Sequence, residues 1–216
     1  MLSVFDRLLD AYGPQGWWPG DSPFEVIVGA ILTQQTTWTN VERALANLKA
    51  AGLLSPEGLR RTPEDELAEL VRPSGFYRTK ARKLKAFARL LDDRFGGDLG
   101  AMLAAPMAEL REALLATHGI GPETADSVLL YAAGRPRFVI DAYARRIFTR
   151  LGHSPDRDTY DAWQWFFESQ LPSDADLFNE YHALIVEHGK RSCRAAPLCG
   201  ECVLAEVCAT GRQRIK

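Results

Sequence analysis

Residues 117–147, THGIGPETADSVLLYAAGRPRFVIDAYARRI, contain the most informative turn in the chain. Gly119–Gly121 predicts a tight turn, and Pro122 suits the first position of a helix, where a missing backbone N–H leaves nothing unpaired. Apolar periodicity predicts that this helix continues to about Gly134. A turn with accessible backbone N–H groups at a helix N-terminus can bind a phosphate.

A carboxylate follows this turn closely in the chain. Phe138–Ile140 is an apolar run that predicts a short extended segment. Asp141 comes directly after it, at the start of a second expected helix, residues 141–151. A phosphate site with one placed carboxylate is therefore the hypothesis that the rest of the chain must support or exclude.

The composition predicts an ordinary globular protein. The 216 residues allow one large domain or two small ones, and a hydrophobic fraction of 46% is ample for a core. No segment approaches the roughly 18 uninterrupted apolar residues of a membrane span. The first residues lack the layout of a signal peptide, so we expect a cytoplasmic protein.

Charge argues against general nucleic-acid binding but allows a local basic face. The net charge is −2. Two clusters are basic, and each is either a solvated helix face or a surface for a polyanion. The first contains Arg78, Lys80, Arg82, Lys83, Lys85 and Arg89, and the second contains Lys190, Arg191 and Arg194.

Helical periodicity dominates the chain and predicts a compact all-α protein with a Cys-rich C-terminal segment. The expected helices are residues 2–12, 23–34, 38–51, 56–61, 63–71, 77–94, 98–103, 106–116, 122–133, 141–151, 158–169 and 173–189. N-terminal caps are expected at Ser22, Ser55, Thr62 and Ser173.

The cysteines are concentrated at the C-terminus. All four lie between residue 193 and the end of the chain, as Cys193, Cys199, Cys202 and Cys208. Disulfides are not expected in a cytosolic chain. Thiolates this dense predict a metal site, either a 4Fe–4S cluster or zinc, and the spacing alone leaves both open.

Two further segments are candidates for contact with a planar ring or a base. Trp17 and Trp18 lie in the Gly/Pro-rich loop 13–20, where they either line a pocket or cover the core. Gln34 and Gln35 lie at the polar end of a buried helix. Their amides suit base edges or a gap in a duplex, and they equally suit a solvated helix end.

Taken together, these motifs resemble the helix–hairpin–helix DNA glycosylases of the endonuclease III type, nearly end to end. Residues 118–125 resemble the hairpin L-P-G-V-G-x-K-T-A, and residues 139–146 resemble V-D-T-H-V-x-R. Residues 31–37 resemble L-L-S-A-Q-A-T, and residues 75–81 resemble G-x-Y-x-x-K-A. The cysteine tail resembles the family's iron–sulfur loop, with its first interval one residue shorter.

The resemblance implies a two-lobed, all-α, endonuclease III-like fold. A six-helix barrel domain with the hairpin would comprise residues 22–133, and an iron–sulfur domain would comprise residues 1–21 with 134–216. The active site would lie in the cleft between the lobes. The family implies a 4Fe–4S cluster on the four cysteines, a monovalent cation at the hairpin, and a monomer that acts on double-stranded DNA containing a damaged base.

The resemblance also implies roles for single residues. Asp141 would be the catalytic carboxylate, and Trp17 or Trp18 would form the base pocket. DNA contacts would come from Gly119, Gly121, Gln34, Gln35, Lys190, Arg191 and Arg194. The shortened cysteine interval leaves the loop 194–198 with a single charge. We therefore expect this loop to bind DNA more weakly than is usual for the family.

Glu123 departs from the family pattern. Bifunctional members have a lysine there, whose amine attacks the sugar C1′ to form a Schiff base. A carboxylate cannot form that imine, so we expect no lyase activity unless another lysine substitutes. The carboxylate also complements the helix dipole.

The expected substrate is an alkylated purine such as 3-methyladenine. A methylated purine carries positive charge and leaves readily, and an indole wall would attract it. Trp17-Trp18-Pro19, and residues 119–126 with Tyr131 after them, resemble the alkylpurine branch. One alternative is a glycosylase for oxidised pyrimidines or mismatched bases. The other is a non-catalytic iron–sulfur DNA-binding protein, against which Asp141 argues.

Overall fold

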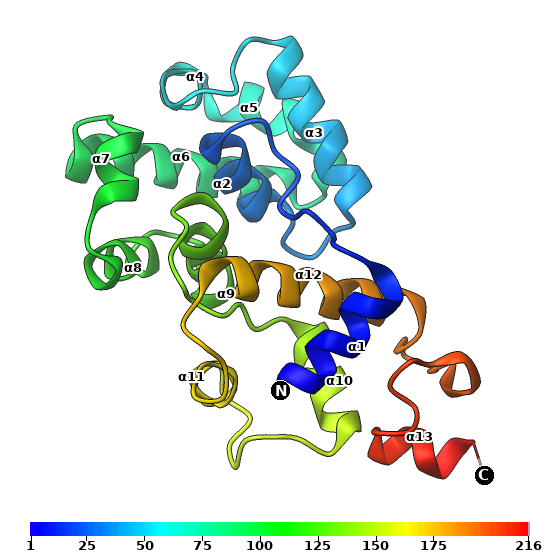
Figure 1. The fold of residues 1–216 in the computed structure, drawn as a ribbon. Helices are drawn as coiled ribbons and strands as arrows, with labels where there is room; N and C mark the ends of the chain where they lie inside the picture. Colours follow the sequence, from blue (N-terminus) through cyan, green and yellow to red (C-terminus); the bar gives the residue numbers. More distant parts are fainter. Residues whose placement is uncertain (216) are drawn as a thin grey trace. The chain divides into compact units, whose positions relative to one another are not determined.

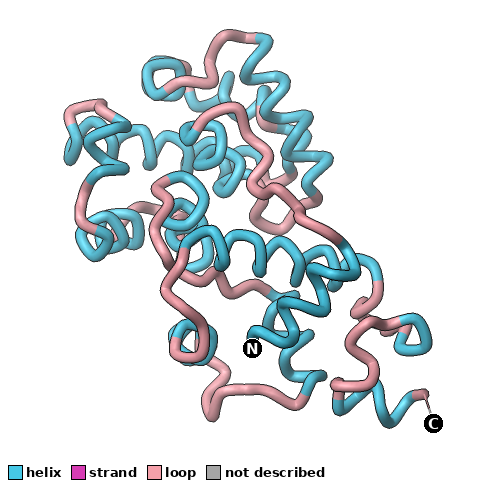
Figure 2. The backbone as a smooth tube through the Cα atoms, in the orientation of Figure 1, coloured by secondary structure: helices cyan, strands magenta, loops and turns pink. Residues whose placement is uncertain are grey.

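The computed structural model describes residues 1–215, and these contain helices and loops but no strand (Figure 2). None of the described helices is long and apolar enough to cross a membrane. The chain divides into two compact units. The terminal unit combines Met1–Trp18 with the chain from Pro136 onward, and the central unit is Pro19–Arg135. The functional domains expected at 22–133 and at 1–21 with 134–216 remain a proposal.

The central unit is built on one helix that is buried on nearly all sides. α2, Pro23–Leu32, begins at Ser22, whose Oγ accepts a hydrogen bond from the backbone N–H of Glu25 at 3.2 Å. A helix with apolar side chains all round must lie inside a core. α2 packs against α3 (Trp38–Ala50), α6 (Tyr77–Phe95), α9 (Pro122–Ser127) and the turn η2 (Val128–Ala132). The other elements of the central unit are α4 (Pro56–Arg61), α5 (Glu64–Leu70), η1 (Arg72–Ser74), α7 (Leu99–Ala104) and α8 (Met107–Leu115), and Figure 1 labels its α-helices.

The basic cluster on α6 is only partly a solvated face. Lys80 is buried, and its Nζ donates to the carbonyl oxygen of Ser74 at 2.5 Å. Lys85 Nζ donates to three main-chain carbonyls, those of Leu59, Arg60 and Thr62, at 2.9, 2.7 and 2.7 Å. These two lysines hold the central unit together instead of offering charge to a polyanion. The arginines of the cluster, Arg78, Arg82 and Arg89, are exposed.

The helix after the hairpin changes its winding. The sequence predicts one helix over residues 122–133, whereas the structure has α9 followed by the π-helical turn η2. The N–H of Ala133 donates to the carbonyl of Val128 at 3.0 Å, one residue further back than in an α-helix. Such wide turns occur often near functional sites.

The terminal unit is arranged on α12, Ala175–Arg191, against which α1 (Leu2–Tyr12) and α10 (Ala142–Leu151) pack. Aromatic rings form its core: Phe138 stacks on Phe167 with centroids 4.2 Å apart, and Tyr181 is fully buried. Phe138–Ile140 is buried as part of a loop and forms no strand. The remaining helices are α11 (Tyr160–Glu168), η3 (Cys199–Glu201) and α13 (Ala209–Arg214).

Candidate active site and cysteine pocket

The hairpin of the central unit presents two backbone N–H groups. It joins α8 to α9, and within it Ile120 N–H donates to the carbonyl of Thr117 at 3.1 Å. The N–H groups of Gly119 and Gly121 have no hydrogen-bond acceptor among the described residues. Gly119 has φ +80°, and a Cβ there would lie 2.4 Å from Lys83 Cγ. Both its conformation and its neighbour therefore require glycine.

Gln34, in the turn after α2, holds this hairpin in place. Its Nε2 donates to the carbonyl of Gly119 at 3.2 Å and to Oγ1 of Thr124 at 2.8 Å. Its Oε1 accepts a hydrogen bond from Lys83 Nζ. Both ends of the amide are thus used inside the central unit. Burial lowers the pKa of Lys83, whose side chain packs beside the hairpin.

Two exposed side chains of the central unit stand on left-handed backbone. Gln35 has φ 54° and is exposed, and Phe76, directly before α6, has φ 45° and is 65% exposed. Left-handed conformations at residues other than glycine cost about 1–3 kcal/mol and are concentrated at functional sites. Sequence reasoning missed Phe76, although an aromatic residue after Gly75 at a helix start was a usable signal.

Glu123 is exposed in the first turn of α9. An acidic side chain there complements the positive end of the helix dipole. The position that would carry a nucleophilic amine in a bifunctional enzyme therefore carries a carboxylate on an ordinary helix start.

Asp141 in the terminal unit is an ionised carboxylate that hydrogen bonds fix in position. It caps α10, and its Oδ1 accepts from the N–H of Ala144 at 2.7 Å. Its Oδ2 lies 3.5 Å from Nε2 of His182, and the Asp141 side chain is 13% exposed. Burial acts to raise the pKa of Asp141, but contacts with His182 and backbone N–H groups outweigh it and the pKa is lowered. The group is therefore a carboxylate at neutral pH.

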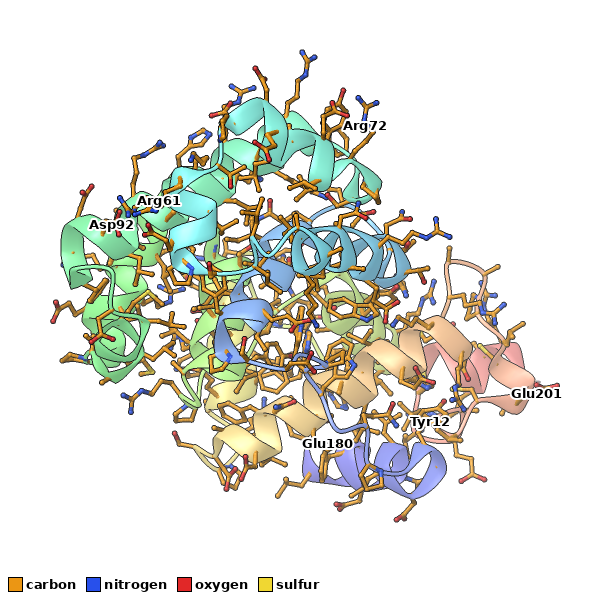
Figure 3. All side chains as sticks on the ribbon, turned by 90° about the horizontal axis from the view of Figure 1, so that it is seen from above. Tyr12, Arg61, Arg72, Asp92, Glu180 and Glu201 are labelled. Atoms are coloured by element: carbon orange, nitrogen blue, oxygen red, sulfur yellow. The ribbon has the colours of Figure 1, made fainter. Side chains whose placement is uncertain are left out.

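Trp17 lies next to this pair. The ring centroids of Trp17 and His182 are 5.9 Å apart. Lys190 Nζ also lies 5.8 Å from the Trp17 ring centroid. Trp18 is adjacent, with ring centroids 5.6 Å apart. The backbone N–H of Gln15 donates to Glu180 Oε1 at 2.6 Å, which connects the tryptophan loop to α12. Figure 3 labels Glu180. The Trp17 indole therefore lies against the histidine that faces Asp141.

The second basic cluster is exposed at the end of α12. Arg191 pairs with Glu187 and lies 5.3 Å from the Tyr12 ring centroid. Arg194 Nε donates to the carbonyl of Lys190 at 2.9 Å. All three basic residues, Lys190, Arg191 and Arg194, are exposed.

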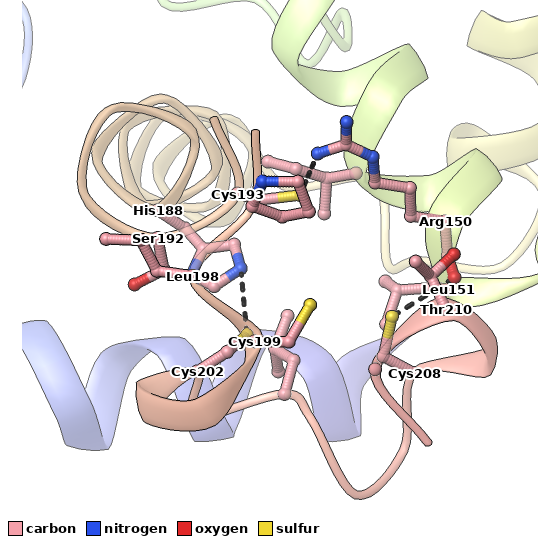
Figure 4. Close-up of a pocket in the computed structure, with 14 residues that line it drawn as sticks. Arg150, Leu151, His188, Ser192, Cys193, Leu198, Cys199, Cys202, Cys208 and Thr210 are labelled. Carbon is pink, nitrogen blue, oxygen red and sulfur yellow. Dashed lines mark hydrogen bonds between the residues drawn. The ribbon is translucent and has the colours of Figure 1, made fainter. Parts of the chain in front are cut away.

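One pocket of the terminal unit is lined by all four cysteines: Cys193, Cys199, Cys202 and Cys208 (Figure 4). The Arg150 guanidinium lies 3.3 Å from Cys193 Sγ, and His188 Nε2 lies 3.7 Å from Cys202 Sγ. The thiols surround the pocket, and nowhere in residues 1–215 do three His, Cys, Asp or Glu side chains converge as ligands of a single ion. Four thiols with a cation beside them fit a thiolate-ligated cluster.

Residues 28–172 match the family model described as HhH-GPD superfamily base excision DNA repair protein. The chain belongs to this family. A provisionally named DNA repair glycosylase of Methanocaldococcus jannaschii is 47% identical over 209 residues, which cover 96% of this chain and 95% of the relative. The match confirms the resemblance seen in the sequence.

Solved structures agree with this assignment. The chain is similar to the Helicobacter pylori 3-methyladenine DNA glycosylase MagIII bound to 1,N6-ethenoadenine, with 32% identity, a TM-score of 0.74, and coverage of 88% of this chain and 94% of that one. A trapped endonuclease III–DNA covalent intermediate has the same fold, with a TM-score of 0.85 at 24% identity and coverage of 100% and 97%. The predicted all-α, endonuclease III-like fold is confirmed, and the chain is a DNA N-glycosylase of base excision repair.

Proposed function

We propose that this glycosylase is monofunctional and hydrolyses the N-glycosidic bond of alkylated purines such as 3-methyladenine. The observation that carries the proposal is the Asp141 carboxylate, mostly buried, ionised, and joined through His182 to the Trp17 ring. This group offers a negative charge and an aromatic face within one compact unit. Those are the two features that a cationic nucleotide requires.

The central unit binds the DNA. The N–H groups of Gly119 and Gly121 donate to a phosphate oxygen, which fixes the register of the backbone without reading sequence. A base inside a duplex must be rotated out of the stack before it can be excised. Gln35 and Phe76 fill the space that it leaves, since both side chains are exposed on constrained backbone. Gln34 keeps the hairpin in shape.

Asp141 acts on the sugar. Departure of the base develops positive charge on C1′, as in other glycosidic hydrolyses, and a nearby carboxylate stabilises that charge. The same carboxylate orients the attacking water or accepts its proton. The hydrogen bond from Ala144 N–H fixes Oδ1, so Oδ2 is the oxygen that this proposal assigns to the reaction.

Glu123 limits the reaction to base removal. An exposed carboxylate cannot attack C1′ to form an imine, so the product is an abasic site and the strand stays intact. Lyase activity would need another amine, and Lys83 packs beside Gly119 while donating to Gln34. That engagement supports the monofunctional proposal.

The indole selects the base. A cation over a tryptophan face is attracted by about 1–2 kcal/mol when water is excluded. Alkylated purines carry such charge in the ground state, so stacking favours them over normal purines. The similarity to MagIII, a protein named as a 3-methyladenine DNA glycosylase, supports this preference.

A 4Fe–4S cluster on the four cysteines is part of the proposal. When bound, it would supply a rigid cross-link of the C-terminal loop and a one-electron redox centre. Arg150 places positive charge beside Cys193 and holds the following loop, through the carbonyls of Arg194 and Ala195 at 2.5 and 2.9 Å. A monovalent cation at the hairpin and action as a monomer on damaged duplex DNA complete the proposal.

The test is base release from matched duplexes that contain 3-methyladenine, thymine glycol or a G·T mismatch, with and without alkali. We expect release of 3-methyladenine and strand breaks only after alkali. Asp141→Asn should be inactive yet still bind DNA. Preferred release of thymine glycol or thymine would transfer the assignment to an endonuclease III-like substrate, and binding without release of any base would favour the non-catalytic protein.

A further inference from the structure

His188 is a buried imidazole that base excision does not use. It lies on α12 and is 1% exposed. Its Nδ1 is 2.9 Å from the hydroxyl oxygen of Tyr12, and its Nε2 is 3.7 Å from Cys202 Sγ. The ring therefore connects the last residue of α1 to one thiol of the cysteine pocket. Figure 4 shows the contact between His188 and Cys202, and Figure 3 marks Tyr12.

The direction of these hydrogen bonds follows from the chemistry of a cluster ligand. A thiolate that ligates iron has no proton, so the Cys202 sulfur can only accept. Nε2 of His188 must then carry the hydrogen. In the neutral ring Nδ1 is consequently the acceptor, and the Tyr12 hydroxyl is its donor. Tyr12 thus fixes the tautomer in which His188 donates to sulfur.

We propose that Tyr12 and His188 form a hydrogen-bond relay to Cys202 that raises the reduction potential of the 4Fe–4S cluster and slows its loss. This inference rests on the cluster of the proposed function. Hydrogen bonds to cluster sulfurs are among the features that set the potential, because they stabilise the more negative, reduced state. Tyr12 does not touch the sulfur and acts on it through His188, whose donating nitrogen it fixes.

The surroundings keep the relay in place. Tyr12 Oη also lies 3.4 Å from Ser192 Oγ, and the Arg191 guanidinium lies 5.3 Å from the Tyr12 ring centroid. Burial is the largest influence on the Tyr12 hydroxyl and raises its pKa, so it remains a donor at neutral pH. The two thiols are supported differently, because Cys193 faces a guanidinium and Cys202 faces this imidazole.

The experiment compares two tyrosine variants that each lose one hydroxyl. Tyr12→Phe removes the donor to His188, whereas Tyr181→Phe removes a hydroxyl of the same unit that donates to the carbonyl of Met1 at 2.9 Å. Iron and sulfide per chain are measured first. The midpoint potential is then measured on wild type and both variants, together with the rate at which absorbance near 400 nm is lost in a chelator.

We expect Tyr12→Phe to shift the midpoint potential to a more negative value and to lose iron faster, while Tyr181→Phe matches wild type. Equal potentials and equal loss rates in all three proteins would overturn the relay. Equal shifts in both variants would also overturn it, since they would reflect general loosening of the unit. If the folded wild-type protein contains no iron, the proposed cluster itself is wrong. The measurement of iron and sulfide per chain distinguishes that outcome from failure of the relay.

Discussion

Oδ2 of Asp141 lies 3.5 Å from Nε2 of His182, and the two side chains are almost completely enclosed. The largest influence on the pKa of Asp141 is burial, which raises it, and His182 is the largest of the influences that lower it. The net effect is a lowered pKa, which favours the ionised carboxylate. The histidine is therefore the main side chain that supports the charge of the proposed catalytic group.

Replacing His182 should impair the reaction most at low pH. In His182→Asn the burial of Asp141 is opposed only by backbone N–H groups, so its pKa rises. Because activity requires the ionised form, the acidic limb of the single-turnover rate should move to higher pH, with a larger effect on rate than on DNA affinity. The rate is measured from about pH 4 to 9, with the exposed His153→Asn as the control. An unmoved acidic limb would contradict this role of His182.

Gly119 and Gly121 make a matched pair for testing the hairpin. Alanine at Gly119 must adopt φ +80° and displace Lys83, whereas a Cβ at Gly121 meets nothing within 4 Å. Left-handed backbone costs a residue with Cβ roughly 1–2 kcal/mol. We expect Gly119→Ala to weaken DNA binding about tenfold or more, and Gly121→Ala to change it much less. Filter binding or anisotropy with an undamaged duplex measures both, and equal losses would exclude a special role for Gly119.

Replacing the two neighbouring glutamines should affect different steps. Gln34→Ala removes the bonds to Gly119 and Thr124, so the hairpin loosens and DNA affinity falls. Gln35→Ala removes an exposed side chain on strained backbone. It should slow base excision in single-turnover assays and leave affinity for undamaged DNA nearly unchanged. A 2-aminopurine reporter beside the lesion would show whether base extrusion is the slowed step.

The positions of the helices could largely be predicted from the sequence. Periodicity and breakers place the helices to within a few residues, because the chain's local preferences agree with its fold. Two of the expected caps are confirmed, at Ser22 and Ser55. Thr62 does not cap α5, since its hydroxyl donates to the carbonyl of Gly58 at 2.6 Å, and Asp174 caps α12 in place of Ser173. The capping residue is the one whose backbone is still extended directly before the helix, and at α12 this is Asp174, one residue after the expected Ser173.

The roles of single polar side chains are harder to predict from the sequence, because they depend on contacts with residues far away in the chain. Nothing local distinguishes Gln34 from Gln35, and the bond from Lys83 to Gln34 joins residues 49 positions apart. The basic cluster on α6 likewise reads as a uniform charged face, although tertiary contacts turn Lys80 and Lys85 toward carbonyl oxygens. The sequence singles out Asp141 and Gly119 because the chemistry proposed for them depends on residue type and on position in the chain, and the structure places Asp141 as the cap of α10 and Gly119 on left-handed backbone.

Glu123 offers the sharpest test of the monofunctional proposal. Wild-type protein incubated with an abasic duplex and borohydride should yield no covalent adduct, because an exposed carboxylate forms no imine that hydride could reduce. Glu123→Lys places an amine in the first turn of α9 and should produce an adduct visible as a slower band on a denaturing gel. Glu123→Gln is the control, since it removes the charge without supplying an amine. If wild type itself is trapped, Lys83→Met identifies whether the lysine beside Gly119 is the nucleophile, and an adduct that survives this change would point to another amine.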